Sequence, residues 1–368
     1  MEFTVPCLFG LEAPAADELK RMGLSNVRAE NGRVHFSGEA RDIARVNLRL
    51  RTGERVLIRM GTFPARSFEE LFEGTKALPW EEYIPIHGAF PVKGYSLNSK
   101  LHSVPDCQSI IKKAAVERLK GRYKTAWFQE TGEIYQIQFS IMKDEASLYI
   151  DTTGAGLHKR GYRAVGVAAP LRETLAAGMV NISRYRGKEP FCDPFCGSGT
   201  IAIEAALAAI NRAPGLTRSF SSQKWGLVPG DVWQQAAQEA KSLEYSGTYD
   251  IWGGDIDPDA VRIARDNARK AGVDKLIRFE VSDAAKFTRA EPGGIIISNP
   301  PYGERMMDKE AAEMLYRAFG KAALGLLRWK LYLLSSQEHF EQAFGRRADK
   351  KRKLYNGMIQ CNLFMFGI

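Results

Sequence analysis

Cysteine is scarce in this chain, and its pattern excludes several classes of protein. Five cysteines among 368 residues are an odd number, unlike the paired framework of a disulfide-stabilised secreted domain. Only Cys192 and Cys196 lie close together, and no further ligand stands near them, so the spacing predicts neither a zinc site nor an iron–sulfur site. We therefore expect free thiols, no metal and a reducing, cytoplasmic location.

Long apolar runs and a cleavable leader are also missing. No stretch of about 18 consecutive apolar residues occurs, which argues against a transmembrane helix. The first 20 residues carry an acid at Glu2, no basic segment and no small-residue cleavage site, unlike a signal peptide. We expect no association with a membrane.

The chain does contain an ordinary globular composition with an excess of positive charge. Hydrophobic residues make up 45% and charged residues 26%, and the length suits two or three domains. The formal net charge is +9, which favours a polyanionic partner because phosphate contacts release counterions.

The first region, residues 1–64, alternates short strands and helices. Its apolar pattern predicts the strand Glu2–Cys7, the helix Ala13–Arg21, the strands Val27–Glu30 and Val34–Phe36, and the helix Ala40–Leu50. Asn31-Gly32 between the two middle strands is a hairpin signal. This order is typical of half of a ferredoxin-like α+β unit.

The second region, residues 65–164, gathers basic and aromatic side chains. The pattern predicts the helices Phe68–Leu78 and Asp106–Leu119 and the strands Phe90–Ser96, Tyr135–Met142 and Glu145–Asp151. Cations are dense between Lys100 and Lys124, beside Trp127, and glycines alternate with cations from Gly154 to Arg163. Such a surface suits RNA, although a solvated helix face and a basic turn explain the same residues. The candidate RNA contacts are Lys112, Lys113, Arg122, Lys124, His158, Lys159, Arg160 and Arg163.

The third region, residues 165–368, alternates helices with strongly apolar strands. The expected strands are Pro190–Cys192, Asp250–Gly254, Ile277–Val281, Gly294–Ser298, Lys330–Ser335, Leu354–Gln360 and Cys361–Phe366. This alternation predicts a doubly wound, mostly parallel α/β sheet, and the last two strands predict an antiparallel closing hairpin. A basic run, Arg346–Lys353, precedes that hairpin as a loop that could contact phosphate or simply be solvated.

A glycine-rich loop follows the first of these strands. It comprises Asp193, Pro194, Phe195, Cys196, Gly197, Ser198, Gly199 and Thr200, and it opens a helix expected over Ile201–Ala209. Glycines allow a ligand to approach the backbone, and a helix N-terminus offers free N–H groups. Glycines alone would also fit a nicotinamide dinucleotide fold. A carboxylate in front of them, Asp193, instead favours a nucleoside that carries a cationic amine.

Acidic residues end the next two strands. Asp255 is placed to accept both ribose hydroxyls, and Ile256 to pack on an adenine face. Asp257 precedes Pro258 as a helix N-cap would. Asp283, followed by Ala284, could accept from the adenine amino group or cap a loop.

The most specific motif is Asn299-Pro300-Pro301-Tyr302 at the end of the fourth strand. The Asn299 side-chain carbonyl and the Pro300 backbone carbonyl can accept both hydrogens of an exocyclic amine, which favours a nucleophilic nitrogen. The prolines stiffen these acceptors, and Tyr302 can stack on a base. The four residues are the catalytic candidates.

Together these motifs resemble the THUMP-domain class I RNA methyltransferases, in particular the bacterial 23S rRNA guanine-N2-methyltransferase family. The resemblance rests on the segments Asp193–Thr200, Gly254–Asp257, Asn299–Arg305, Gly156–Arg163 and Ala169–Glu173, and it covers essentially the whole chain. It implies a ferredoxin-like domain (1–64), an RNA-binding THUMP domain (65–164) and a Rossmann-like catalytic domain (165–368). It also implies S-adenosyl-L-methionine as cofactor, held by Asp193, Phe195, Gly197, Asp255 and Asp283, and guanine N2 of 23S rRNA as target. One departure is the long stretch Asn211–Tyr249, which could touch substrate or pack on the sheet.

Other functions stay open on the residues alone. The motif at Asn299 serves adenine N6 as readily as guanine N2, and a tRNA substrate fits as well as rRNA. A cytosine-C5 enzyme is disfavoured because no cysteine adjoins the motif. A non-catalytic RNA-binding assembly factor and a nicotinamide-dependent oxidoreductase each leave Asp193 and Asn299 unexplained. The sequence assigns no oligomeric state.

Overall fold

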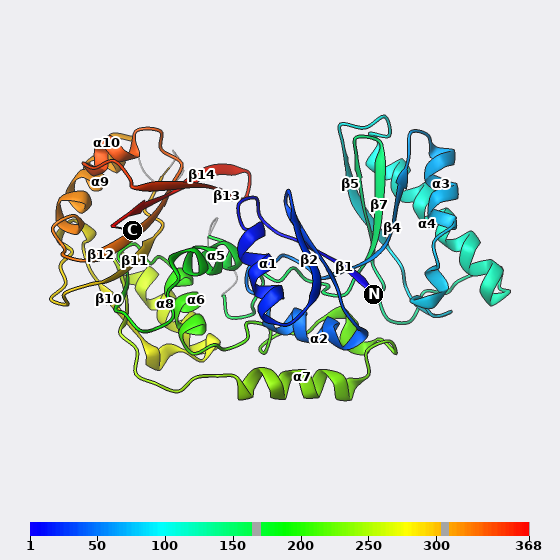
Figure 1. Ribbon diagram of the computed structural model, residues 1–368, viewed down its shortest axis with the longest axis horizontal. Helices are drawn as coiled ribbons and strands as arrows, with labels where there is room; N and C mark the ends of the chain where they lie inside the picture. The colour runs from blue at the N-terminus through cyan, green and yellow to red at the C-terminus, as the bar shows by residue number, and fades with distance from the viewer. Residues whose placement is uncertain (164–170, 303–308, 368) are drawn as a thin grey trace.

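The computed structural model describes residues 1–163, 171–302 and 309–367, and its strands form two seven-stranded sheets. In Figure 1 the sheet built from the first 151 residues runs from the centre to the right, and the C-terminal sheet lies at the left. No helix in this described part of the chain combines the length and apolarity needed to span a bilayer.

The first sheet joins the two N-terminal regions in one hydrogen-bonded unit, in the strand order β2-β3-β1-β4-β7-β6-β5. Its elements are β1 (Glu2–Pro6), α1 (Glu12–Arg21), β2 (Ser25–Glu30), β3 (Arg33–Ser37), α2 (Ala40–Arg49), β4 (Leu57–Pro64), α3 (Phe68–Lys76), the 3₁₀ helix η1 (Trp80–Glu82), β5 (Val92–Leu97), α4 (Val104–Tyr123), β6 (Ile137–Met142) and β7 (Glu145–Asp151). Strand β4 pairs with β1 on one side and β7 on the other, so it ties the two regions together.

One face of this sheet carries a continuous apolar core beneath the helices. Phe3 lies opposite Ile58, Ile58 opposite Ile150, and Ile150 opposite Ile137. Directly opposed residues point to the same face, and all four are fully buried in one cluster. The two N-terminal regions therefore share a core as well as a sheet.

The residues at the turns explain the two hairpins of this sheet. Strand β4, in contrast, was not predicted from the sequence. Gly32 adopts a φ of +72°, which confirms the predicted Asn31-Gly32 hairpin. Lys143 and Asp144 both have positive φ, as a type I′ turn between β6 and β7 requires. In β4 the register shifts between Arg59 and Gly61, and this bulge breaks the two-residue alternation that a strand prediction depends on.

The second sheet has the order β10-β9-β8-β11-β12-β14-β13. Its region contains α5 (Glu173–Ser183), β8 (Phe191–Asp193), α6 (Thr200–Ala209), η2 (Ser221–Lys224), α7 (Gly230–Ser242), β9 (Ile251–Asp255), α8 (Pro258–Ala271), η3 (Asp274–Leu276), β10 (Ile277–Val281), η4 (Ala284–Lys286), β11 (Gly294–Ser298), α9 (Lys309–Ala323), β12 (Trp329–Ser335), α10 (Phe340–Phe344), β13 (Lys350–Asn356) and β14 (Ile359–Phe366). The first five strands in this order are parallel, and β14 is antiparallel to both neighbours. The doubly wound α/β sheet with a closing hairpin is confirmed.

Both faces of the second sheet are covered, which explains its continuously apolar strands. Ile295 and Ile297 pack in the cluster formed with α5, α6 and α8, whereas Ile296 packs in the cluster formed with α9 and α10. The chain order reverses at β8, which lies between β9 and β11. In such sheets a ligand crevice opens at the carboxyl ends of the strands beside this reversal.

The bounds predicted for the closing hairpin were wrong. The turn lies at Gly357-Met358, so the expected strand Leu354–Gln360 in fact spans that turn. The second half of the predicted basic loop, Lys350–Lys353, belongs to β13. A sheet edge tolerates such charges because one side of the strand faces solvent, and Lys351 pairs with Glu341 there at 2.5 Å.

The stretch Asn211–Tyr249 packs on the N-terminal unit. The buried Trp225 ring stacks on Tyr135 with centroids 4.5 Å apart, and Trp233 stacks on Phe220 at 5.3 Å. Helix α7 runs alongside α2, away from its own sheet (Figure 1). The sequence left open whether this stretch contacts the substrate or packs on the sheet. It packs, but on the N-terminal sheet, and we call residues 211–249 the strap.

Candidate active site

The glycine loop lies at the carboxyl end of β8, where the ligand crevice is expected. Gly197 and Gly199 have φ of +50° and +82°, and Gly199 caps α6. A Cβ on Gly199 would stand 2.9 Å from Ala264 Cβ, whereas a Cβ on Gly197 would meet nothing within 4 Å. Gly199 thus allows α6 to pack on α8, and Gly197 faces open space that a ligand can occupy.

Asp193, the last residue of β8, is fully buried, and only one of its two carboxylate oxygens has hydrogen-bond partners among the described residues. Its Oδ1 accepts hydrogen bonds from the Ser298 hydroxyl and, at 3.3 Å, from the Phe195 amide. Its Oδ2 is buried without a partner among the described residues. Burial raises the pKa of Asp193 to about 7, against the two hydrogen bonds, and the nearby Asp255 charge adds to the rise. An oxygen left in this state is suited to a cationic donor from a ligand.

Asp255, at the end of β9, is held by the glycine loop itself. Its Oδ2 accepts from the Gly197 amide at 2.8 Å and its Oδ1 from the Asp257 amide at 3.0 Å. These bonds fix the carboxylate in place while leaving lone pairs for two ribose hydroxyls. The next side chain, Ile256, is 71% exposed, an unusual position for isoleucine and a suitable one for covering an adenine face.

The other two predicted acids serve as helix caps. Asp257 accepts from the Asp259 amide at 2.9 Å and begins α8, as the Asp-Pro sequence predicted. Asp283 accepts from the Ala285 amide at 2.9 Å and begins η4, while Ala284 is buried. A cap occupies one oxygen of Asp283, so its predicted adenine contact stays a prediction.

The remaining loop residues build the walls of the site. Pro194 is buried, and the Phe195 ring meets Phe319 edge-on at 5.0 Å. Ser198 accepts from Asn267 through its carbonyl at 3.0 Å. Cys196 packs on the opposite face of the sheet from Cys192, and the described residues hold no group of three or more His, Cys, Asp or Glu side chains placed to bind a metal.

The Asn299–Tyr302 motif follows β11, the strand beside β8. Asn299 Oδ1 is buried and lacks a hydrogen-bond partner among the described residues. The Pro301 carbonyl accepts the Tyr316 hydroxyl, which anchors the two prolines to α9. Gly303, Glu304 and Arg305 of the predicted segment lie outside the described residues, as do Ala169 and Pro170 of the other.

Tyr302 is more enclosed than a base-stacking residue was expected to be. Its side chain is 6% exposed, and its hydroxyl accepts from Asn356 at 3.0 Å and lies 3.6 Å from Cys361 Sγ. Burial raises the pKa of Tyr302, so the hydroxyl stays protonated. The β13–β14 hairpin therefore holds this side chain, and its stacking on a base stays a prediction.

The sequence did not identify two residues, Ser298 and Arg163, as residues that position the glycine loop. Ser298 connects the strand that ends in Asn299 to Asp193, and its place just before that motif was the available signal. Arg163 donates to Thr200 Oγ1 at 2.9 Å and to the Leu171 carbonyl at 2.8 Å, and its Nε lies 3.5 Å from Glu173. Arg163 was a predicted RNA contact, but these bonds tie it to the first turn of α6.

The predicted RNA contacts divide by exposure. Lys113, Arg122 and Lys124 are exposed on α4 and at its end. Lys112 instead donates to the Phe90 carbonyl and to Glu130, at 3.0 Å and 2.6 Å, which commits it to structure.

The second group of predicted contacts divides in the same way. Lys159 is exposed, whereas His158 lies 2.9 Å from Glu54. Arg160 is 1% exposed, pairs with Glu204 at 3.3 Å and donates to the Arg51 carbonyl at 2.6 Å. A phosphate cannot reach it, so the prediction for Arg160 was wrong: the side chain joins two domains.

Three family models match successive parts of the chain. The RlmL ferredoxin-like domain matches residues 2–57, the THUMP domain residues 65–151, and the RMKL-like methyltransferase domain residues 160–364. The last match covers the whole glycine loop and the Asn299 motif.

Relatives of known name match along nearly the full chain. The YpsC protein of Bacillus subtilis, provisionally named an RNA methyltransferase, is 46% identical over 97% of this chain and 93% of its own. The ribosomal RNA large subunit methyltransferase K/L of Psychromonas ingrahamii is 34% identical over 99% of this chain. The chain spans about half the length of that relative, 50%.

Solved structures give the same fold and a bound ligand. A Listeria monocytogenes protein, described by prediction as an N6-adenine-specific DNA methylase, is 46% identical, with a TM-score of 0.94 and coverage of 99% of this chain and 95% of that one. The SMU.472 protein, provisionally a methyltransferase, was solved in complex with SAH; it is 41% identical, with a TM-score of 0.94 and coverage of 99% and 97%. The open space over Gly197 and the buried oxygens of Asp193 and Asn299, which have no partner among the described residues, fit a bound cofactor and substrate. Because the methyltransferase model matches more than half of its length, the chain belongs to the RMKL-like methyltransferase family, with S-adenosyl-L-methionine as its cofactor.

Proposed function

We propose that this chain methylates the exocyclic N2 of a guanine in 23S ribosomal RNA. One observation carries the proposal: the side-chain carbonyl oxygen of Asn299 is buried and has no hydrogen-bond partner among the described residues, at the end of the strand adjacent to the cofactor loop. A buried acceptor without a donor costs free energy, so a donor from the substrate would stabilise this position.

The acceptor atoms account for the chemistry on nitrogen. S-adenosyl-L-methionine, when bound, supplies an electrophilic methyl group. Asn299 Oδ1 and the Pro300 carbonyl each accept one hydrogen of the amine, which draws its lone pair out of conjugation with the ring. Because both prolines stiffen the segment and Tyr316 anchors it, these acceptors need no reorganisation during the reaction.

The cofactor contacts follow from the same geometry. Asp193 Oδ2 would take the ammonium group, Asp255 the ribose hydroxyls and Ile256 one adenine face. Phe195, Gly197 and Asp283 complete the set that the resemblance implies. Each assignment places a charged or polar ligand group against an atom of matching chemistry.

An RNA substrate is supported by the relatives and by an open surface. The K/L relatives are named for large-subunit ribosomal RNA, and a THUMP domain is present. On the first sheet, Thr4 and Tyr149 alternate with core residues, so they point away from the helices. A groove of about 400 Å³ on that side is lined by Arg33, Arg55, Tyr95 and Arg172, among others. Cations beside aromatic rings suit single-stranded RNA.

Adenine N6 is the second candidate target. The Listeria relative is described with that specificity, and adenine N6 is an exocyclic amine like guanine N2. Both amines would satisfy Asn299 and Pro300, so the motif accepts either.

Nucleoside mass spectrometry of separated rRNA and tRNA, from cells with and without the gene, tests the proposal. Loss of N2-methylguanosine from the 23S fraction is the expected result. Loss from tRNA alone would move the substrate to tRNA, and loss of N6-methyladenosine would move the target base. No change in any methylated nucleoside would contradict the proposal and favour a non-catalytic RNA-binding role. A cytoplasmic location, where ribosomal RNA is found, belongs to the same proposal.

A further inference from the structure

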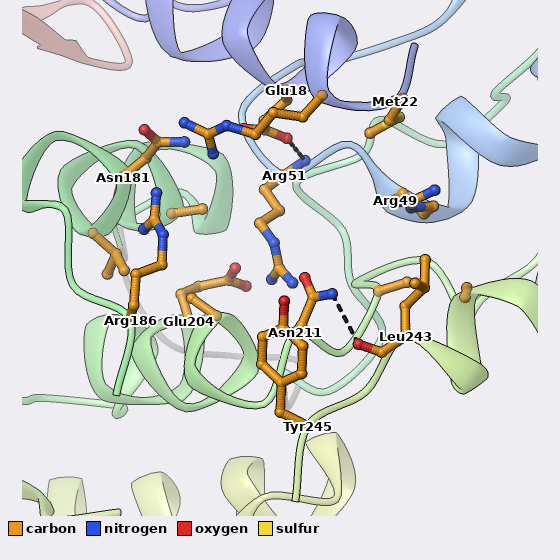
Figure 2. A pocket seen from close by; sticks show the side chains of 16 residues that line it. Glu18, Met22, Arg49, Arg51, Asn181, Arg186, Glu204, Asn211, Leu243 and Tyr245 are labelled. Carbon is orange, nitrogen blue, oxygen red and sulfur yellow. Dashed lines mark hydrogen bonds between the residues drawn. The ribbon is translucent and has the colours of Figure 1, made fainter. Parts of the chain in front are cut away.

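A second cavity, of about 440 Å³, lies where three parts of the molecule meet. Its walls come from the ends of α1 and α2, from α5 and α6, and from the strap. Figure 2 shows the Arg51 side chain crossing it toward Glu204 and Tyr245, with Arg186 and Asn181 on another wall. Tyr245 is 62% exposed, so the cavity opens to solvent at that side.

The cavity lining carries more positive than negative charge. Four arginines line it, namely Arg21, Arg49, Arg51 and Arg186, against two glutamates, Glu18 and Glu204. Of the four, Arg49 pairs with Glu239 at 3.1 Å. Among the described residues the other three form no ion pair.

Both glutamates are already bonded. Glu18 accepts from the Arg51 backbone amide at 2.6 Å and from the Thr52 hydroxyl at 2.7 Å. Burial raises the pKa of Glu18, against the hydrogen bonds from Arg51 and Thr52. Glu204 accepts from Arg160 at 3.3 Å and from Tyr162 at 3.1 Å, both through Oε1, and its Oε2 is buried without a hydrogen-bond partner among the described residues. The two carboxylates therefore offset only part of the charge of the lining arginines, which outnumber them four to two.

The Arg51 guanidinium has a buried N–H donor for which the described residues supply no acceptor. Its Nη2 donates to the carbonyls of Leu207 and Arg212, but its Nη1 is buried and has no acceptor among the described residues. Arg186 uses one nitrogen on the Tyr185 carbonyl. A guanidinium does not release its proton in a protein, so burial beside like charges is unfavourable until an anion offsets it.

We propose that this cavity binds a phosphate group. A phosphate presents three or four oxygens and up to two negative charges, which matches several guanidinium forks better than one carboxylate does. The Asn181 side chain and the Tyr245 hydroxyl line the same space and can add donors. The volume falls in the usual range for small-ligand sites, about 300–1,000 Å³, so an organic group attached to the phosphate also fits. The phosphate comes either from a small phosphorylated molecule or from the RNA backbone.

Thermal unfolding tests the site with inorganic phosphate as the probe. At ten times its dissociation constant, phosphate should raise the melting temperature of the full chain by about 2 °C relative to chloride at equal ionic strength. Arg186→Gln should abolish this rise, and Arg21→Gln, at an exposed position that is easily tolerated, should reduce it. The control is Arg262→Gln, at an exposed arginine on α8 that does not line the cavity, and this variant should keep the full response.

The salt dependence of RNA binding separates the two sources. With unmodified 23S rRNA transcript, loss of one phosphate contact lowers the slope of log affinity against log salt by about 0.7–0.9. A smaller slope in Arg186→Gln but not in Arg262→Gln assigns the phosphate to RNA, with or without a response to inorganic phosphate. An unchanged slope together with a phosphate response lost in Arg186→Gln assigns it to a small molecule. Unchanged slopes, together with no phosphate-specific rise or an equal rise in wild type and Arg186→Gln, would overturn the proposal. Neither readout involves methyl transfer, so failure here is distinct from failure of the proposed function.

Discussion

At the scale of single residues, the proposed active site contains two buried oxygen atoms that have no hydrogen-bond partner among the described residues. One is Oδ2 of Asp193, at the end of β8, and the other is Oδ1 of Asn299, just after the adjacent strand β11. Ser298 donates to Asp193 and immediately precedes Asn299, so the two positions are joined directly. In the proposed function two different molecules complete them: the ammonium group of S-adenosyl-L-methionine at Asp193 and the exocyclic amine of the target base at Asn299.

Removing the Asn299 acceptor should separate catalysis from cofactor binding. We expect Asn299→Ala to lower the rate of methyl transfer by about 10²–10³-fold, the usual effect of losing one preorganised group. Binding of S-adenosyl-L-methionine should change little, because the contacts at Asp193 and Asp255 remain. Asp255→Ala should instead weaken the binding of S-adenosyl-L-methionine, while the Asn299 acceptor remains in place. Tritiated methyl transfer to RNA from gene-deleted cells, with calorimetry of cofactor binding, measures both; transfer at the wild-type rate in Asn299→Ala would refute the role of that side chain.

Cofactor affinity should depend on pH through Asp193. Its pKa is raised from 3.8 to about 7 by burial, so the carboxyl is largely protonated below neutrality and attracts an ammonium group weakly. We expect the dissociation constant to rise by up to about tenfold per pH unit below pH 7 and to be nearly constant just above it. The stability of the free protein depends on pH in the opposite direction. Between these two pKa values the folded state holds a proton that the unfolded chain has released, so the contribution of this group to stability falls as pH rises.

Calorimetry from about pH 6 to pH 7.5 checks the Asp193 prediction. Asp193→Asn should bind the cofactor more weakly and without this pH dependence, whereas Asp257→Asn, at a helix cap, should keep the wild-type profile. A flat profile in the wild-type protein would exclude Asp193 as the ammonium partner.

At the scale of secondary-structure elements, the strap determines how the catalytic sheet is joined to the rest. It leaves the catalytic sheet after α6, packs η2 and α7 on the N-terminal unit, and returns to form β9. Trp225 is its main anchor: the ring is 2% exposed, and its Nε1 donates to the Ile134 carbonyl at 3.1 Å.

Two tryptophans with different surroundings test the anchor. Trp225→Ala should lower the free energy of unfolding by about 3–5 kcal/mol, because it leaves a large cavity and a carbonyl without its donor. Trp127→Ala, at a side chain that is 78% exposed, should change it by no more than about 0.5 kcal/mol. Urea denaturation compares the two, and equal effects would show that the strap does not anchor the N-terminal unit through Trp225.

At the scale of the whole molecule, buried charge joins the N-terminal unit to the catalytic sheet. Arg160 and Glu204 form a pair whose side chains are almost completely buried, and Arg160 also donates to the Arg51 carbonyl. Arg51 in turn donates to the Leu207 and Arg212 carbonyls. Arg51 and Glu204 of this network also line the cavity for which we propose phosphate binding. Arg163 contacts the first turn of α6, the helix that carries Glu204.

A double-mutant cycle measures how strongly Arg160 and Glu204 stabilise each other. Arg160→Met alone should cost about 3–5 kcal/mol, because it leaves Glu204 buried without its partner. Arg160→Met with Glu204→Met should cost less than the sum of the single changes, with a coupling of about 0.5–3 kcal/mol. The exposed pair Arg262–Asp259 is the control and should couple by less than about 0.5 kcal/mol. Urea denaturation supplies all the values, and additive effects at Arg160 and Glu204 would argue against the pair.

Much of the fold and the core of the site could be read from local patterns. Parallel strands bring their carboxyl ends to one edge of the sheet, so the sequence alone predicts that Asp193, Asp255 and Asn299 lie close together at that edge. The helix cap at Asp257 and the turn at Asn31-Gly32 were equally local. Two elements were not predicted correctly from local patterns. A bulge interrupts the alternation of β4, and the turn of the final hairpin at Gly357-Met358 lies inside a segment that was predicted as one strand.

By itself the sequence determined the order of strands and helices, the glycine loop and the acceptor motif, because each depends on residues that are neighbours in the chain. Only the tertiary structure decided which cations are free. Lys112 and Arg160 looked like phosphate contacts, but segments distant in sequence supply Glu130 and Glu204 as their partners. The tertiary structure also decided where the strap packs and that Arg51 Nη1 is buried without an acceptor from the part of the chain that the structure describes. Burial and pairing are properties of contacts between remote segments, so composition and spacing could not predict them.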